Sequence, residues 1–182
     1  MRKEDGMLKI QTERLELHKI SKHDKVRFFE LLSNSELLSY VCNSLSQEEI
    51  ELQFQSRLQP WNLDSPHWLT LSVFEKLSGS FIGINGFKHH KGNASVGFIF
   101  LHPYHGLGYA TESLSAVCEY AQSLGIKELS ANVTKGNTAS ECVVKKCGFA
   151  FVREIPAAVQ IGDKLYNDVE YKKMLNQNSN SR

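Results

Sequence analysis

The sequence is poor in the features that mark membrane proteins and nucleic-acid-binding proteins. Its 182 residues include only four prolines and four cysteines, and 21 basic residues nearly balance 20 acidic ones, for a net charge of +1. No apolar run approaches the roughly 20 residues that span a bilayer, and no run of five or more like charges occurs. We therefore expect no membrane segment, and the charge gives no reason to expect direct nucleic-acid binding.

The cysteines and histidines form no recognisable pattern for a metal or a disulfide framework. None of the cysteines belongs to a CxxC pair, and the seven scattered histidines contain no HExxH motif. We therefore expect no metal site, and we expect reduced, buried thiols in a cytoplasmic protein. The four cysteines are Cys42, Cys118, Cys142 and Cys147.

Length and composition are those of one globular domain. Apolar residues make up 41% and charged residues 23% of the chain, which are ordinary values for a protein with its own core. The charged start leads into no apolar signal region, and the segment 176–182 is polar. We expect one domain over residues 8–175, with flexible ends at 1–7 and 176–182.

Hydrophobic periodicity predicts an α/β domain. Ser46 and Glu49 form a capping box before one helix, and Gly125 follows the last apolar position of another. The predicted helices are 22–32, Gln47–Leu58, 109–124 and Thr138–Lys146. The predicted strands are 12–19, 68–74, 81–87, 96–101, 129–133, 149–155 and 166–174. In this order they make a mixed sheet, with an antiparallel first half followed by two β-α-β steps.

The most informative segment is His-Gly-Leu-Gly-Tyr-Ala at 105–110, between a predicted strand and a strongly patterned helix. Glycine permits positive φ and lets a ligand approach the backbone closely. Unpaired N–H groups and the positive end of the helix favour an anion. The segment therefore fits either a pyrophosphate site or an ordinary structural turn. It is not a P-loop, because no Gly-Lys-Ser or Gly-Lys-Thr follows.

This segment resembles the cofactor-binding motif of the GNAT superfamily of N-acetyltransferases, Gln/Arg-x-x-Gly-x-Gly/Ala. Gly108 and Ala110 match the motif, and His105 stands at its first position. A second string over 137–149, Asn-x-x-Ser followed by Lys-x-Gly-Phe, is similar to the family's downstream motif. The resemblance is to the RimJ/RimL-like subgroup, which acetylates ribosomal-protein N-termini. It implies the GNAT fold: a mixed, mostly antiparallel sheet with a splayed central strand pair, flanked by helices.

On this resemblance, acetyl-CoA is the cosubstrate and no metal takes part. The loop amides would hold the pyrophosphate, and the strand at 96–100 would pair with pantetheine. An N–H group at 98–100 would polarise the thioester carbonyl. The departure at His105 affects a side-chain contact rather than the amide cradle. The residues implied in cofactor binding are Phe98, Ile99, Phe100, His105, Gly106, Leu107, Gly108, Tyr109, Ala110 and Asn137.

The second string carries the catalytic candidate. Many relatives place a tyrosine acid where this chain has Val144, and the resemblance implies that Ser140 donates the proton to the leaving thiolate instead. Ser140 could equally be a first-turn helix residue that satisfies a backbone group. Asn137 could be the helix N-cap, a pantetheine contact, or both. Ser95 and Val96 stand where many relatives carry a carboxylate base.

Four further side chains are candidates near the groove. Glu112 matches a common family residue, but acidic residues are favoured in first helical turns, so we interpret it as structural. Tyr104, His102 and His90 are weaker catalytic candidates than Ser140.

The acceptor is expected to be a primary amine, and the missing base favours an α-amine. At pH 7 roughly a sixth of α-amines with a pKa of about 7.7 are neutral, against about four in ten thousand lysines. The preferred partner is a ribosomal-protein-type N-terminus, and the protein is expected to be a monomer or a homodimer. The alternatives are a small amine such as a polyamine, an amino acid or an aminoglycoside, and a non-catalytic acyl-CoA-binding module.

Overall fold

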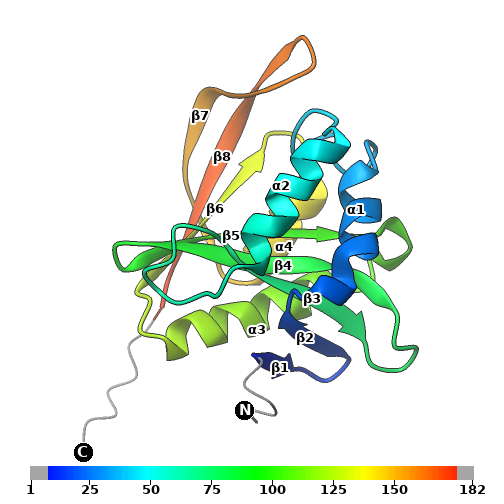
Figure 1. The fold of residues 1–182 in the computed structure, drawn as a ribbon. Coiled ribbons are helices and arrows are strands. Elements are labelled where there is room, and N and C mark those ends of the chain that lie inside the picture. Colours follow the sequence, from blue (N-terminus) through cyan, green and yellow to red (C-terminus); the bar gives the residue numbers. More distant parts are fainter. Residues whose placement is uncertain (1–7, 176–182) are drawn as a thin grey trace, which may run out of the picture.

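A mixed β-sheet runs through residues 8–175, the part of the chain that the computed structural model describes (Figure 1). The ends at 1–7 and 176–182, expected to be flexible, lie outside the described residues. The eight strands of the described part follow the order β1-β2-β3-β4-β5-β6-β8-β7. They are β1 (Lys9–Gln11), β2 (Leu15–Lys19), β3 (Leu69–Glu75), β4 (Phe81–His90), β5 (Asn93–Phe100), β6 (Glu128–Thr134), β7 (Ala150–Ile161) and β8 (Lys164–Met174).

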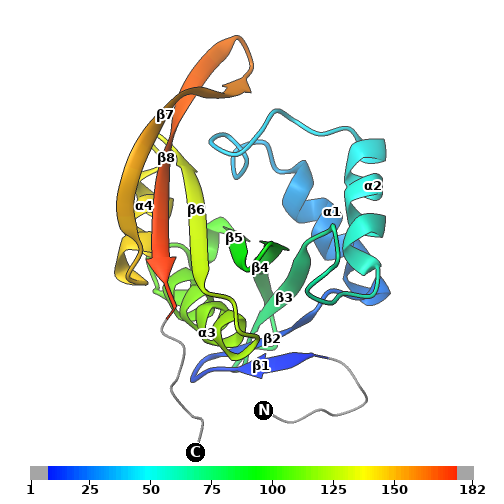
Figure 2. The ribbon, with the colours of Figure 1, turned by 90° about the vertical axis from the view of Figure 1, so that its left-hand side faces the viewer.

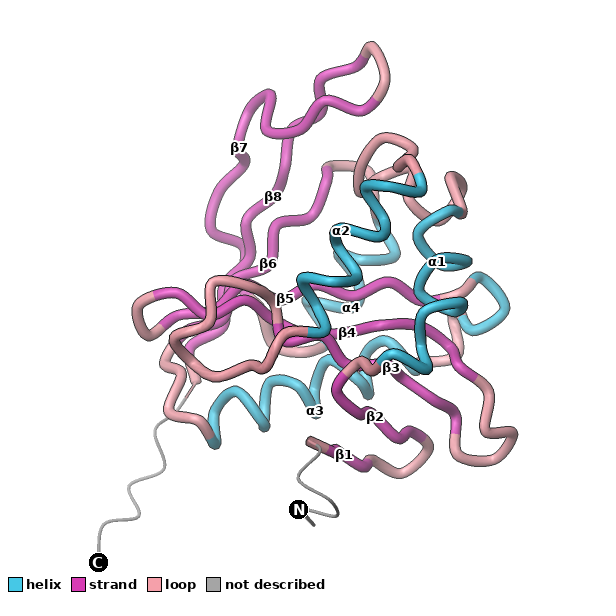
Figure 3. The backbone as a smooth tube through the Cα atoms, viewed as in Figure 1, coloured by secondary structure: helices cyan, strands magenta, loops and turns pink. Residues whose placement is uncertain are grey.

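Helices cover both faces of this sheet. They are α1 (Lys25–Ser33), α2 (Gln47–Leu58), α3 (Tyr109–Ser123) and α4 (Thr138–Lys146), with short 3-10 turns η1 (Lys22–Asp24) and η2 (His102–Tyr104). The pair α1 and α2 lies on one face, and α3 and α4 lie on the other (Figure 2, Figure 3). The prediction of an α/β domain with a mixed sheet between helices is confirmed.

Each face of the sheet has its own apolar core. The larger core lies under α3 and α4 and includes Leu114 and Val117, both fully buried. The smaller core packs Phe28 of α1 against Phe54 of α2, with ring centroids 5.3 Å apart. Because helices cover both faces, side chains that alternate across β3 are all shielded, and its first five residues are buried in succession.

The parallel strand pair in the middle of the sheet separates soon after it begins. Within the described chain, β5 and β6 are in register only at 93–95 and 128–130. β4 continues to pair with β5 as far as Phe100, so the open edge of β5 is the one that faces β6. The expected splayed central pair is therefore present.

The second predicted β-α-β step differs from a simple crossover. β6, α4 and β7 follow one another in sequence, but β8 lies between β6 and β7 and is antiparallel to both. The turn at Gly162 and Asp163 is so short that β8 must return alongside β7. β8 thereby takes the place next to β6 that a simple crossover would give to β7.

Two predicted strands have different limits in the structure. The predicted strand 12–19 is two strands, because the chain reverses at 12–14 and β1 pairs back on β2. The predicted strand 149–155 continues as the long β7. A bulge between Ile155 and Val159 interrupts its pairing with β8 and accommodates Pro156, which has no backbone N–H to donate. The resulting β7–β8 hairpin extends beyond the rest of the sheet (Figure 1, Figure 2).

The predicted helix 22–32 begins as the separate turn η1 before α1. Asp24 ends this turn, and its Oδ2 accepts from the backbone N–H of Ser21 at 2.8 Å. Among the residues that the structure describes, no helix is both long and apolar enough to cross a membrane.

Candidate functional site

The loop between η2 and α3 has a backbone conformation that favours glycine. Gly106 and Gly108 have φ angles of 75° and 84°, and Gly108 is the N-cap of α3. The backbone N–H groups from Gly106 to Ala110 donate to no acceptor within residues 8–175. With the positive end of α3 behind them, these amides are suited to an anion such as a pyrophosphate.

An ion pair fixes this loop from the side of β2. Glu112, in the first turn of α3, accepts from the backbone N–H of Arg14 at 2.8 Å and from Arg14 Nε at 2.7 Å. It also accepts from Thr12 Oγ1 at 2.5 Å. Arg14 Nη1 donates in turn to the carbonyl of Leu107 at 3.0 Å. Because that peptide is trans, the Gly108 N–H points the opposite way, away from Arg14.

The electrostatics of this Arg14–Glu112 clamp favour an ionised carboxylate. Burial opposes ionisation, but hydrogen bonds from Thr12 and Arg14 outweigh it and lower the pKa of Glu112. The hydrogen bond that Arg14 donates to Glu112 raises the pKa of Arg14 against the opposing effect of burial. Glu112 lines neither cavity described below. It is a structural residue, as the sequence indicated.

His105 makes hydrogen bonds within the protein through both its backbone N–H and its imidazole ring. Its N–H donates to the carbonyl of His102 at 3.0 Å, so this amide is not part of the free set that begins at Gly106. Its Nε2 lies 2.7 Å from the carbonyl oxygen of Phe100 and must be the protonated nitrogen, because a carbonyl only accepts. The imidazole therefore ties the loop to the end of β5.

A cavity of about 600 Å³ lies between this loop and the start of α4. Most of the residues predicted to bind the cofactor line it, namely Phe98, Ile99, Phe100, His105, Gly106, Gly108, Ala110 and Asn137. Leu107 and Tyr109 do not line it. The Leu107 side chain is exposed, and Tyr109 is buried with its hydroxyl donating to Glu75 Oε1 at 2.6 Å. These two residues can contribute backbone amides but not side chains.

The start of α4 adjoins the same cavity. Asn137 Oδ1 accepts from the backbone N–H of Ser140 at 3.1 Å, so Asn137 is the N-cap of this helix. The Ser140 hydroxyl makes no hydrogen bond to any residue of the described chain and lines the cavity. Val144, at the position where many relatives have tyrosine, is fully buried. Ser140 and Thr138 are thus the residues of α4 that bring hydroxyl groups to this space.

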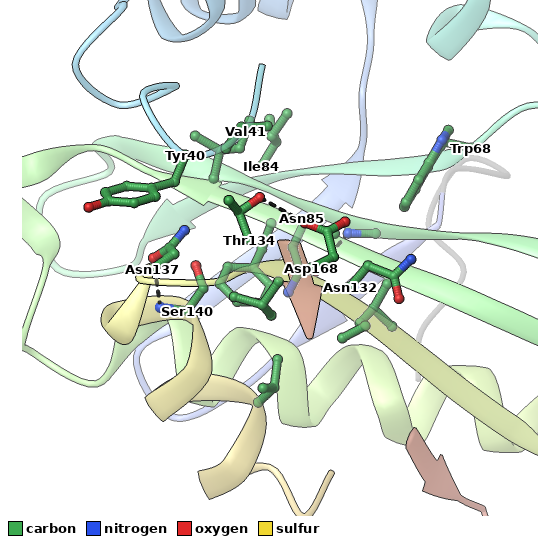
Figure 4. Close-up of a pocket in the computed structure, with 18 of the residues that line it drawn as sticks. Tyr40, Val41, Trp68, Ile84, Asn85, Asn132, Thr134, Asn137, Ser140 and Asp168 are labelled. Carbon is green, nitrogen blue, oxygen red and sulfur yellow. Dashed lines mark hydrogen bonds between the residues drawn. The ribbon is translucent and has the colours of Figure 1, made fainter. Parts of the chain in front are cut away.

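A second cavity of about 310 Å³ continues from the first across the splayed strands (Figure 4). The two cavities share Tyr40, Val41, Phe98, Ile99, Asn137 and Ser140 in their linings. Asp168 of β8 lines the second cavity, and its Oδ1 accepts from Thr134 Oγ1 at 3.1 Å. Figure 4 shows Asp168 and Thr134 between Tyr40 on one side and Trp68 on the other.

Asp168 was not predicted as a site residue. Nothing local in its predicted strand shows that β8 is inserted beside β6. That insertion pairs Thr134 with Asp168 and brings a carboxylate to the open end of the splay. The carboxylate base that many relatives carry at the positions of Ser95 and Val96 therefore has a candidate replacement from the far end of the chain.

The remaining sequence candidates lie in several places. Tyr104 and His102 line the larger cavity, whereas His90 lines neither. Ser95 lies 3.1 Å from the Ser130 hydroxyl, where β5 and β6 still pair. The prediction of buried cysteines is confirmed for Cys118 and Cys147, but Cys42 is only partly buried. It is wrong for Cys142, which is exposed because its face of α4 borders the larger cavity rather than the core.

Comparison with known proteins now decides the family. A family model described as "Acetyltransferase (GNAT) domain" matches residues 14–150. The chain belongs to the GNAT acetyltransferase family. It is also 31% identical over 97 residues to an uncharacterized N-acetyltransferase, YycN, of Bacillus subtilis. That match spans 50% of this chain and 62% of the relative's length.

Solved structures of GNAT proteins share the fold over almost their whole length. A GNAT-family acetyltransferase from Bacillus anthracis is 20% identical, with a TM-score of 0.78 over 92% of this chain and 98% of its own. A Salmonella typhimurium acetyltransferase that modifies the N-terminal serine of ribosomal protein L7/L12 is 18% identical, with a TM-score of 0.79 over 93% and 100%. Spermidine N-acetyltransferase from Vibrio cholerae, in complex with CoA and spermine, is 15% identical, with a TM-score of 0.78 over 90% and 97%. At these identities the likeness concerns the fold.

Proposed function

We propose that this GNAT protein transfers the acetyl group of acetyl-CoA to the α-amine of a protein N-terminus. The observation that carries the proposal is the junction of the two cavities at Phe98, Ile99, Asn137 and Ser140. The free amides at 106–110 bind the pyrophosphate on one side of this junction. The acceptor enters from the other side, so donor and acceptor meet beside the open edge of β5.

Each step of the acetyl transfer is assigned to a particular group of the chain. An N–H on the open edge of β5, at 98–100, stabilises the negative charge that develops on the thioester oxygen. Asp168 takes the proton that the amine nitrogen loses as it forms the new amide bond, directly or through one water. Ser140 Oγ relays a proton to the sulfur as the carbon–sulfur bond breaks, giving up its own proton and taking one from water. Asn137 keeps the first turn of α4 in place while Ser140 acts.

Two arguments favour an α-amine over a lysine side chain. At neutral pH the neutral fraction of an α-amine is greater by a factor of several hundred. A fold relative from Salmonella typhimurium modifies an N-terminal serine, which supports the same acceptor here. The spermidine enzyme of the same fold supports a small amine as the second candidate.

The test compares a short peptide that has a free N-terminus with its N-acetylated, lysine-containing twin. CoA release and mass spectrometry of the products report both the rate and the modified atom. We expect acetylation of the free N-terminus and little product from the blocked twin. Faster acetylation of the blocked twin or of spermidine contradicts the proposal, and no CoA release with any amine supports the non-catalytic alternative.

A further inference from the structure

One cation of the second cavity, the proposed acceptor cavity, has no counter-ion among residues 8–175. Arg57, in the last turn of α2, lines this cavity and is half-buried. Its Nη1 donates to Thr70 Oγ1 at 3.4 Å, and its guanidinium carbon lies 5.1 Å from the centre of the Trp68 ring. No carboxylate of residues 8–175 lies within ion-pair distance of Arg57.

The unused hydrogen-bonding capacity of Arg57 is large. A guanidinium carries five N–H donors in a fixed fork that matches a carboxylate. Apart from the contact to Thr70, these donors find no acceptor among the described side chains and backbone. Burial disfavours the charged form and lowers the pKa of Arg57 to about 10, so the group is still a cation at pH 7. A half-buried cation with free donors is a site for an anion.

The opposite charge in this cavity belongs to Asp168. It lies beside Thr134, near the junction where Ser140 and Asn137 stand, whereas Trp68, on which Arg57 rests, stands on the other side of it (Figure 4). Asp168 and Arg57 do not form an ion pair with each other. The cavity therefore presents an anion beside the reacting atoms and a cation further away.

We infer that the acceptor is an α-amine with a carboxylate close to it, the amine facing Asp168 and the carboxylate facing Arg57. This inference rests on the proposed transfer to an α-amine and specifies its substrate class. The carboxylate is either the side chain of an acidic second residue or the α-carboxylate of a free amino acid. A polyamine lacks such an anion and would place a second positive charge near Arg57.

The experiment uses four amines and the full-length protein. The peptides Ala-Glu-Ala-Ala amide and Ala-Gln-Ala-Ala amide differ in one charge, and alanine and alaninamide differ in the α-carboxylate. Rates are compared as kcat/KM per neutral amine. We expect the acidic member of one pair to be preferred by about tenfold or more, the size of a charge-assisted hydrogen bond. The pair that shows the preference identifies the source of the carboxylate, and a preference for alanine over alaninamide contradicts a protein N-terminus as the acceptor.

Variants connect the preference to Arg57. In the pair that shows the preference, Arg57→Gln should bring the ratio of kcat/KM for the acidic amine to kcat/KM for the neutral amine close to one. It should do so mainly by lowering the rate with the acidic substrate. Arg27→Gln is the matched control, because Arg27 also lies near an aromatic ring, 5.4 Å from that of Phe74, but lines neither cavity. It should leave the ratio unchanged.

Three results overturn the inference. The first is a ratio near one for both pairs with wild-type protein, a measurement that does not depend on how well a variant folds. The second is a preference that survives in a folded Arg57→Gln protein. The third is the absence of product from all four amines, which overturns the proposed α-amine function and this inference with it. A measurable but charge-independent rate overturns only the inference.

Discussion

The Arg14–Glu112 clamp should set the affinity for acetyl-CoA although neither side chain lines the cofactor cavity. We propose Glu112→Gln as the perturbation. The amide oxygen of glutamine can still accept from the backbone N–H of Arg14. Its NH2 group then faces Arg14 Nε, and because both groups are donors, no hydrogen bond forms between them. Arg14 is released, and the carbonyl of Leu107 loses the contact that aligns the loop.

Two opposing effects follow from this change. Removing an anion near the phosphate loop favours a negatively charged ligand, but across solvent this is worth only about 0.2–1 kcal/mol. Releasing the loop requires binding to order its backbone again, at about 1–2 kcal/mol per residue. The second effect is larger, so the KM for acetyl-CoA should rise about five- to tenfold, since 1.4 kcal/mol corresponds to a factor of ten.

Stability should change in the same variant and with a defined pH dependence. The Arg14 side chain is 41% exposed, so the lost ion pair is worth only about 1 kcal/mol, or a Tm lower by about 2–4 °C. Because the folded pKa of Glu112 is lowered, its contribution is complete above the ordinary pKa of about 4.3 and is lost as pH falls through the folded value. The difference between wild type and variant should therefore be present at pH 7 and disappear in acid.

Initial-rate kinetics at varied acetyl-CoA concentration and thermal unfolding at several pH values measure these effects. Glu119→Gln is the control, since Glu119 is an exposed residue of the same helix. It should leave both the KM and the Tm unchanged. An unchanged or lower KM in Glu112→Gln, with a lowered Tm, would show that the clamp stabilises the fold without positioning the loop.

Three other substitutions test the loop and α4. Gly108→Val should abolish acetyl-CoA binding, because φ is 84° and the added Cβ would lie 3.3 Å from the Arg14 guanidinium; unchanged calorimetric affinity in a folded variant would refute this. His105→Gln should keep the KM for acetyl-CoA within a few-fold, because a glutamine NH2 can replace the bond to the Phe100 carbonyl; a large rise means that the imidazole contacts the cofactor. Ser140→Ala should lower kcat at least tenfold with nearly unchanged acetyl-CoA affinity, because the bond to Asn137 uses the backbone N–H that alanine retains. The opposite pattern, weaker binding and normal kcat, makes Ser140 a binding residue only.

The cofactor loop was predictable because its signal is local. Two glycines spaced by one residue before an amphipathic helix specify positive φ, a free amide and a helix N-terminus within a few residues of chain. The N-cap role of Asn137 and the end of α3 ahead of Gly125 are local in the same sense. Steric and hydrogen-bonding preferences over such short separations are carried by the residues themselves.

The acceptor side was not predictable in this way. Asp168 enters the site because β8 is inserted between β6 and β7, and Arg57 enters because α2 packs over Trp68. The predicted strand and helix that contain these two residues gave no sign of what each side chain would face.

The sequence by itself determined the family, the order of helices and strands, and the place of the phosphate loop. The tertiary structure decided which distant groups support that loop and which charges meet in the acceptor cavity. Arg14 and Glu112 are 98 residues apart in sequence, and Thr134 and Asp168 are 34 apart. Such pairs depend on strand order and helix packing, which are set by burial over the whole domain and not by the periodicity of any one segment.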